Sequence, residues 1–152
     1  MRISAKADYA VRAGIELAAS DQEGMLKIEQ IARAQDIPRK FLEAILNDMR
    51  RANLVVSVRG AHGGYRLARP AAAISVADII RAVDGPLVSV RGERPTDLEY
   101  SGAAVSLLPL WIAVRANVRA VLEEVSLADL AAGRLGARVR RLARAAEAWD
   151  NP

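Results

Sequence analysis

The 152-residue chain contains no cysteine and only one histidine, His62. The lack of cysteine excludes a disulfide scaffold, a cysteine-ligated zinc site, a cysteine nucleophile and a thiolate-bound iron–sulfur cluster. One imidazole is too few for a histidine-based metal site or a histidine-dependent catalytic triad. The sequence therefore predicts no enzyme, no metal site and no cofactor.

Long apolar runs are also lacking. No run approaches the roughly 20 residues that span a bilayer, and the first residues lack the apolar stretch of a signal peptide. We expect a cytoplasmic protein without a membrane partner. Apolar residues still make up 52% of the chain, which is enough for a core without disulfides.

Lysine is scarce: only Lys6, Lys27 and Lys40 among the 22 basic side chains are lysines. The others are arginines, whose planar fork suits phosphates and base edges. Residues 1–70 hold 12 basic and 8 acidic side chains, whereas residues 71–152 hold 10 of each, so the first part carries the whole net charge of +4. This asymmetry indicates a nucleic-acid-binding part, with a solvated arginine-rich surface as the alternative.

Three helices are expected in the first 51 residues. Apolar residues recur at helical spacing over 4–19, with Ser4 as N-cap, and again over 28–35, while the polar stretch 20–24 predicts a loop. Pro38 suits the first turn of a third helix. The predicted inner face of that helix carries Phe41, Leu42, Ile45, Leu46 and Met49. A short helix, a tight turn and a longer helix with a basic outer face are typical of a helix-turn-helix.

A basic hairpin follows this helix-turn-helix. Residues 54–58 and 65–67 predict two strands, and the three glycines in 59–64 predict the turn between them. Residues 38–69 hold 7 basic and 2 acidic side chains, a net charge of +5. The hairpin is therefore predicted to be a DNA-binding wing.

The second half of the chain predicts a helix that ends at Gly85, an aperiodic loop over 87–102 and a long helix from about residue 106. Ser106 is the expected N-cap of the long helix, and a short helix is expected from Ser126 to Gly133. One side of the long helix repeats apolar residues at steps of four and three: Leu107, Trp111, Val114, Val118, Val121 and Val125. This spacing favours a homodimer interface over packing against the first domain.

Several segments resemble the Rrf-two family of bacterial winged-helix transcription regulators. They are Met1–Ala10, Phe41–Glu43 and Ser57–Leu67, with weaker continuation at Ile79–Gly85 and Leu127–Leu130. The resemblance implies a winged helix-turn-helix followed by a long helix that crosses its twin. It also implies homodimers that bind imperfect palindromes in double-stranded DNA.

Many members of the family hold an iron–sulfur cluster through three cysteines in the loop before the dimer helix. In this chain Gly92, Leu98 and Ala104 stand near those positions, and none can ligate iron. Asp8, near an acidic ligand of some members, is better explained by the helix dipole. The chain therefore resembles a cluster-free branch of the family.

The predicted fold is mostly α with a small β-hairpin wing. Residues 1–85 form the winged helix-turn-helix and 86–105 a sensor-type loop. Residues 106–133 form the dimerisation helix with the short helix after it, and 134–152 an arginine-rich tail. The tail is expected to be solvated, with a second DNA contact or a frayed end as alternatives.

The predicted DNA contacts lie on the third helix, the wing and the start of the chain. They are Arg2, Ser4, Lys6, Tyr9, Lys27, Pro38, Arg39, Lys40, Glu43, Asn47, Ser57, Arg59, Gly60, His62 and Gly63. Arg39 could bind a guanine edge or a phosphate, and Arg59 could enter a narrow A·T-rich minor groove. Glu43 could accept from a cytosine amino group or neutralise Arg39 or Lys40.

The predicted function is a homodimeric, sequence-specific DNA-binding regulator, with repression favoured. Its effector is a small molecule or a protein, and Leu98, Tyr100 and Trp111 are weak pocket candidates. Regulation through the protein's abundance alone is a third possibility. The alternative function is an interaction module that docks a protein through the winged helix. The charge of +5 on helix and wing argues against this alternative.

Overall fold

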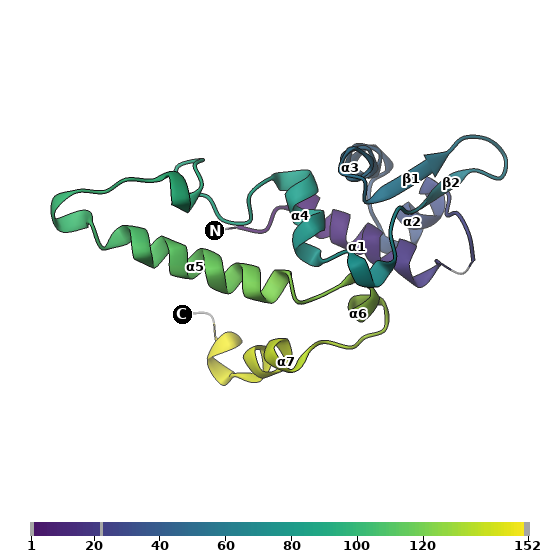
Figure 1. Ribbon diagram of the computed structural model, residues 1–152. Coiled ribbons are helices and arrows are strands. Elements are labelled where there is room, and N and C mark those ends of the chain that lie inside the picture. Colours follow the sequence, from purple (N-terminus) through teal and green to yellow (C-terminus); the bar gives the residue numbers. More distant parts are fainter. Residues whose placement is uncertain (1, 22, 151–152) are drawn as a thin grey trace.

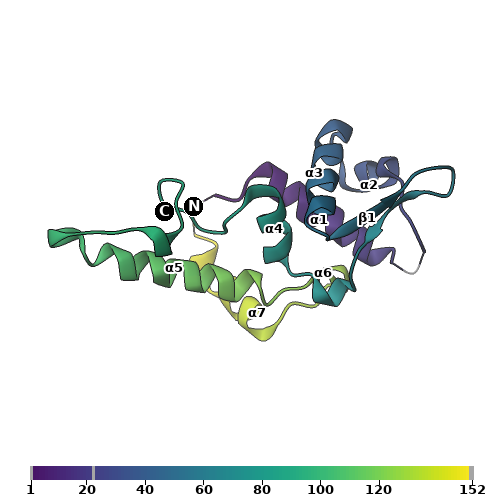
Figure 2. The ribbon, with the colours of Figure 1, turned by 45° about the horizontal axis from the view of Figure 1, so that its top comes forward.

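The computed structural model describes residues 2–21 and 23–150 (Figure 1). Met1 of the first matching segment, Gln22 of the expected loop and the last two residues of the tail lie outside this range. The helices are α1 (Ala5–Ala19), α2 (Ile28–Gln35), α3 (Arg39–Arg51), α4 (Val76–Asp84), α5 (Leu107–Leu122), α6 (Leu127–Ala131) and α7 (Ala137–Arg144), and the strands are β1 (Val55–Val58) and β2 (Gly64–Leu67). The fold is thus mostly helical with a two-stranded antiparallel sheet, as predicted. The wing and the free end of α5 lie at opposite ends of the molecule (Figures 1 and 2).

Helix α1 is the centre of the helical bundle. It begins after Ser4, whose Oγ accepts a hydrogen bond from the amide of Ala7 at 2.9 Å, which confirms the predicted N-cap. Its inner face is lined largely by alanine and glycine, so neighbouring helices approach closely. A Cβ added at Gly14 would lie 3.1 Å from the side chain of Leu127 in α6. Helices α4 and α6 therefore pack directly on α1.

Helices α2 and α3 form the predicted helix-turn-helix. The chain turns at Asp36, which adopts the left-handed conformation (φ 50°), and Pro38 immediately precedes α3. The inner face of α3 buries Leu42, Ile45, Leu46 and Met49. The prediction that Phe41 packs inward is wrong, because its side chain is 59% exposed. Phe41 lies about 100° around the helix from Leu42, so it falls at the edge of the buried face.

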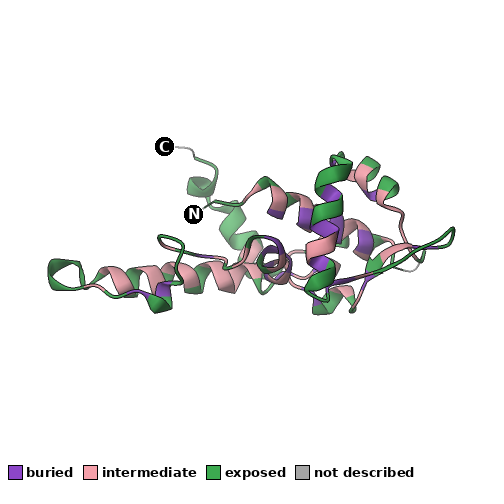
Figure 3. Ribbon diagram, turned by 90° about the horizontal axis from the view of Figure 1, so that it is seen from above, coloured by how far each residue is buried: buried purple, intermediate pink, exposed green. Residues whose placement is uncertain are grey.

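The wing is a short hairpin anchored to the chain before α2. Val55 pairs with Leu67 at its base, and Val58 pairs with Gly64 near its tip. The backbone of Tyr65 also exchanges two hydrogen bonds with that of Leu26, at 2.9 and 2.7 Å. Strand β2 is therefore fixed at Tyr65 to the segment before α2, while the turn beyond the strands is exposed over residues 59–62 (Figure 3).

Two capping boxes set the starts of α4 and α6. Ser75 and Asp78 form the first, and Ser126 and Asp129 form the second. Ser75 and Ser126 also face each other in an isolated antiparallel bridge. Leu127 is fully buried, so α6 belongs to the core around α1 although it follows α5 in the sequence.

Helix α5 is shorter than predicted. Ser106 stands at the N-cap position, but its side chain makes no capping hydrogen bond. The helix ends at Leu122, so the prediction that Val125 continues its apolar side is wrong. Val125 is 7% exposed, and its carbonyl accepts a hydrogen bond from the amide of Val76 at 2.9 Å. The helix cannot run through Ser126, because this N-cap of α6 has an extended backbone (φ −91°, ψ 162°).

No residue of α5 is buried. By length and hydropathy alone, the helical stretch Gly102–Leu122 could cross a membrane. On that criterion, the prediction that no stretch is long and apolar enough is wrong. The stretch contains Arg115 and Arg119, and an arginine costs about 3 kcal/mol at the centre of a bilayer.

Helix α7 occupies the arginine-rich tail. It is exposed over most of its length. An ion pair between Arg138 Nε and Glu124 Oε2, at 3.1 Å, joins it to the link between α5 and α6. The tail is thus a solvated helix over 137–144.

Candidate DNA-binding surface

Helix α3 and the wing together enclose a groove of about 550 Å³. Five predicted DNA contacts line it: Lys40, Glu43, Asn47, Ser57 and Arg59. Ala44, Leu46, Arg50, Val58, Gly64 and Tyr65 complete the lining. The structure therefore brings together, on one concave face, side chains from two segments of the chain.

The charges on α3 are partly paired within the protein. Arg39 forms ion pairs at 3.3 Å with both Glu29 and Glu43. Glu43 thus neutralises Arg39 in the free protein, which is the alternative role considered from the sequence. Within residues 2–21 and 23–150, Lys40 forms no ion pair, so its charge is available to a phosphate.

Sequence reasoning missed Arg50. Its Nη2 atom donates a hydrogen bond to Oδ1 of Asn47 at 2.9 Å, and both side chains line the groove. Arg50 follows Asn47 by three residues and Glu43 by seven, so helical spacing places all three on one face. This helical spacing is the sequence signal that could have placed Arg50 among the groove residues.

The wing tip brings its backbone close to its own strand. A Cβ added at Gly63 would lie 2.0 Å from the carbonyl oxygen of Val58, so only glycine fits there. Lys27 donates from Nζ to the carbonyl oxygen of Gly60 at 2.9 Å. Lys27 therefore supports the wing tip in the free protein. Arg59 is exposed beside this turn.

Two of the DNA contacts predicted at the start of the chain, Ser4 and Lys6, bind groups within the protein instead. Ser4 donates from its hydroxyl to the carboxylate of Asp84. Lys6 Nζ donates to the carbonyl oxygen of Val83 at 2.9 Å and pairs with Asp48 Oδ2 at 2.7 Å. These side chains join α1 to α3 and α4, and a phosphate would have to compete for them.

The remaining predicted contacts are dispersed. Arg2 lines a pocket with residues of α5. Tyr9 is half-buried, and its ring meets that of Phe41 edge-on with centroids 6.4 Å apart. Pro38 and His62 are exposed on the turn before α3 and on the wing tip.

The weak effector candidates hold the loop 86–105 against α5. Trp111 donates from Nε1 to the Tyr100 hydroxyl at 3.1 Å, and Leu98 is 3% exposed. Five of the predicted dimer residues, Leu107, Trp111, Val114, Val118 and Val121, are half-buried along α5.

The residues of this loop do not fit an iron–sulfur cluster. Residues 86–105 contain neither cysteine nor histidine, and the whole chain lacks thiolates. Across the described part of the chain, no group of three or more histidine, aspartate or glutamate side chains lies together so as to hold a metal ion.

The helix-turn-helix, the anchored wing and the basic groove define a winged-helix DNA-binding protein. Residues 3–133 match the Rrf2 family, described as iron-dependent transcriptional regulators. A Mycobacterium tuberculosis H37Rv protein, Rv1287, whose name assigns it to the HTH-type transcriptional regulators, is 50% identical over 143 residues, covering 94% of this chain and 89% of that protein.

Two solved structures are similar throughout. That of CymR (YrzC), the global cysteine regulator of B. subtilis, has a TM-score of 0.75 and 34% identity, covering 89% of this chain and 99% of that chain. That of T. potens IscR has a TM-score of 0.68 and 32% identity, covering 100% of this chain and 93% of that chain. The chain belongs to the Rrf2 family of transcription regulators, and its relatives are regulators rather than enzymes.

Proposed function

We propose that the chain forms a homodimer in the cytoplasm that binds an imperfect palindrome in double-stranded DNA and represses transcription. The observation that carries this proposal is the groove between α3 and the wing, within a segment of net charge +5. With α3 in the major groove of a duplex and Arg59 at the adjacent minor groove, the sugar-phosphate backbone between them would run along this groove of the protein. The signal is a small molecule or a protein rather than an iron–sulfur cluster.

The apolar side of α5, whose residues are only half-buried in the single chain, supports the homodimer. A symmetric dimer would bury the same side chains on both copies and would present two wings to two half-sites. Val114→Asp places a charge on this side and should yield a monomer in sedimentation. Ala116→Asp, on the exposed opposite side of the helix, should remain a dimer. Equal behaviour of the two variants would contradict this interface.

The decisive experiment is selection of random genomic fragments by the purified protein at moderate salt, with sequencing of the bound pool. We expect an imperfect palindrome with half-sites about one helical turn apart. A pool without an enriched motif, from a folded dimer, would contradict effector-free specific binding and favour a protein-docking role.

The sign of regulation needs a second experiment. Higher expression from the recovered promoters in a deletion strain would identify a repressor, and lower expression would identify an activator.

A further inference from the structure

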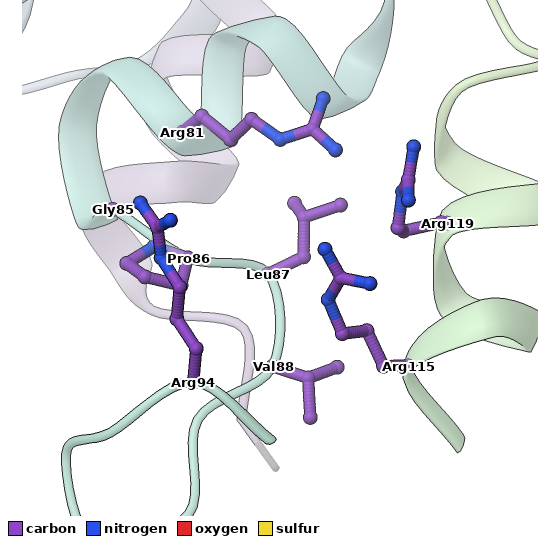
Figure 4. A pocket seen from close by; sticks show the side chains of 8 residues that line it. All are labelled: Arg81, Gly85, Pro86, Leu87, Val88, Arg94, Arg115 and Arg119. Atoms are coloured by element: carbon purple, nitrogen blue, oxygen red, sulfur yellow. The ribbon is translucent and has the colours of Figure 1, made fainter. Parts of the chain in front are cut away.

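Four arginines line a pocket of about 350 Å³ between α4, the loop 86–105 and α5 (Figure 4). Arg81 comes from the end of α4, Arg94 from the loop 86–105, and Arg115 and Arg119 from α5. The guanidinium groups of Arg81, Arg115 and Arg119 border the space around Leu87, and that of Arg94 lies beside Pro86 and Gly85 (Figure 4). The pocket therefore lies where the winged helix-turn-helix meets the proposed dimerisation helix.

The positive charge in this arginine pocket is only partly neutralised. Glu123 pairs with Arg81 and with Arg119, the latter at 2.9 Å between Oε1 and Nε. Within residues 2–21 and 23–150, Arg94 and Arg115 form no ion pair or hydrogen bond through their side chains. Four guanidinium ions and one carboxylate leave a net charge of +3. A ligand with two or more negative groups would offset most of this charge.

The wall of the pocket between these charges is apolar. Val88 is buried and Leu87 is half-buried, and both line the pocket. Its volume is at the lower end of the range for small-molecule sites. A short carbon skeleton could lie on these side chains while its anionic groups reach the arginine forks, which bind carboxylate or phosphate oxygens bidentately.

We propose that the arginine pocket is the effector site and binds a small organic anion with two or more carboxylate or phosphate groups. This inference rests on the proposed function only in calling the ligand an effector. A bound anion would bridge Arg81 of α4, Arg94 of the loop 86–105 and Arg115 of α5. It would thereby fix the orientation of the winged helix-turn-helix relative to the dimerisation helix.

The test is calorimetric titration of the purified full-length protein with citrate and with pyrophosphate, at constant ionic strength set by chloride. Wild type should bind at least one of these probes saturably. Arg94→Gln/Arg115→Gln should weaken binding at least tenfold. The matched control is Arg141→Gln/Arg144→Gln, which removes two positive charges from exposed positions of α7 and should bind as wild type does.

Absence of saturable binding of both probes to wild type would overturn the proposal, as would equal weakening in the two double variants. Dissociation of the dimer by Arg94→Gln/Arg115→Gln, without anion binding to wild type, would instead show that a carboxylate of the second copy fills the pocket. DNA binding is measured separately with the probe absent. Loss of palindrome recognition there would count against the proposed function and leave the calorimetric result standing.

Discussion

At the tip of the wing, Gly60 and Gly63 differ in what a side chain would meet. A Cβ at Gly63 would meet the carbonyl oxygen of Val58 at 2.0 Å, whereas one at Gly60 (φ +108°) would meet nothing within 4 Å. Gly60→Ala should cost about 1–2 kcal/mol of backbone strain. Gly63→Ala must displace the tip as well, so we expect DNA affinity to fall about tenfold further. Equal affinities of the two variants, measured by fluorescence anisotropy, would contradict this account.

Arg59 is the residue at which minor-groove binding can be tested. Narrow A·T-rich grooves concentrate negative potential and attract arginine side chains. Arg59→Ala should therefore weaken binding about tenfold to a palindrome with A·T-rich flanks and much less to the same palindrome with G·C-rich flanks. The comparison requires titrations of both duplexes at one salt concentration. An equal loss on both would indicate a phosphate contact.

Residues whose roles depend on local geometry were the most predictable from the sequence. The N-cap at Ser4 and the glycine turn of the wing follow from nearby atoms, and both are confirmed. Phe41 was mispredicted because an apolar residue at the edge of a helical face can turn either way. Its partner, Tyr9, is remote in the sequence.

At the scale of elements, Lys6 and Lys40 have different surroundings in the free protein, and both are predicted to contact DNA. Lys6 links α1 to Asp48 of α3 and to the backbone of Val83 in α4, whereas Lys40 lines the groove. Lys40→Ala should lower the slope of log affinity against log salt by about one unit, as the loss of a phosphate contact does. Lys6→Ala should leave that slope unchanged.

Lys6 should instead be coupled to Asp48. A double-mutant cycle with Lys6→Ala and Asp48→Asn should give a stabilising coupling in the free energy of unfolding of about 0.2–1 kcal/mol, because both side chains are partly exposed. A reduced salt slope for Lys6→Ala together with zero coupling would restore Lys6 to the DNA contacts.

The elements themselves were predictable because periodicity and capping signals are local. The bounds 28–35 for α2, the end of α4 at Gly85 and the start of α6 after Ser126 agree with the structure. The extent of α5 was not predictable in this way. The apolar repeat continues to Val125, whereas the capping box at Ser126 requires the helix to end earlier. Where two local signals compete, the cap decides because it fixes the backbone.

At the scale of the molecule, the sequence indicated two functional regions but not how they are joined. The spacing of Arg115 and Arg119 places them on one side of α5. Nothing local indicates that Arg81 and Arg94 meet them, because that pocket arises from contacts between remote segments. The same contacts join the winged helix-turn-helix to α5. Glu123 is the acidic side chain at this junction, where it pairs with Arg81 and Arg119.

Glu123 makes this junction sensitive to acid. Hydrogen bonds from Arg119 and then Arg81 lower the pKa of its carboxyl from 4.5 to about 2. Because the folded-state pKa is the lower one, the stabilisation is complete above about pH 5 and is lost as the pH falls toward 2. The charge of the arginine pocket therefore stays constant near neutral pH.

We expect the difference in the free energy of unfolding between wild type and Glu123→Gln to be constant from about pH 8 to pH 5 and to shrink below that. Urea titrations at several pH values measure it. Glu147→Gln, at an exposed position of the tail, is the control and should match wild type throughout. A difference that grows on acidification would mean that Glu123 is stabilised as the neutral acid. In that case its ion pairs with Arg81 and Arg119 would not hold α4 to α5.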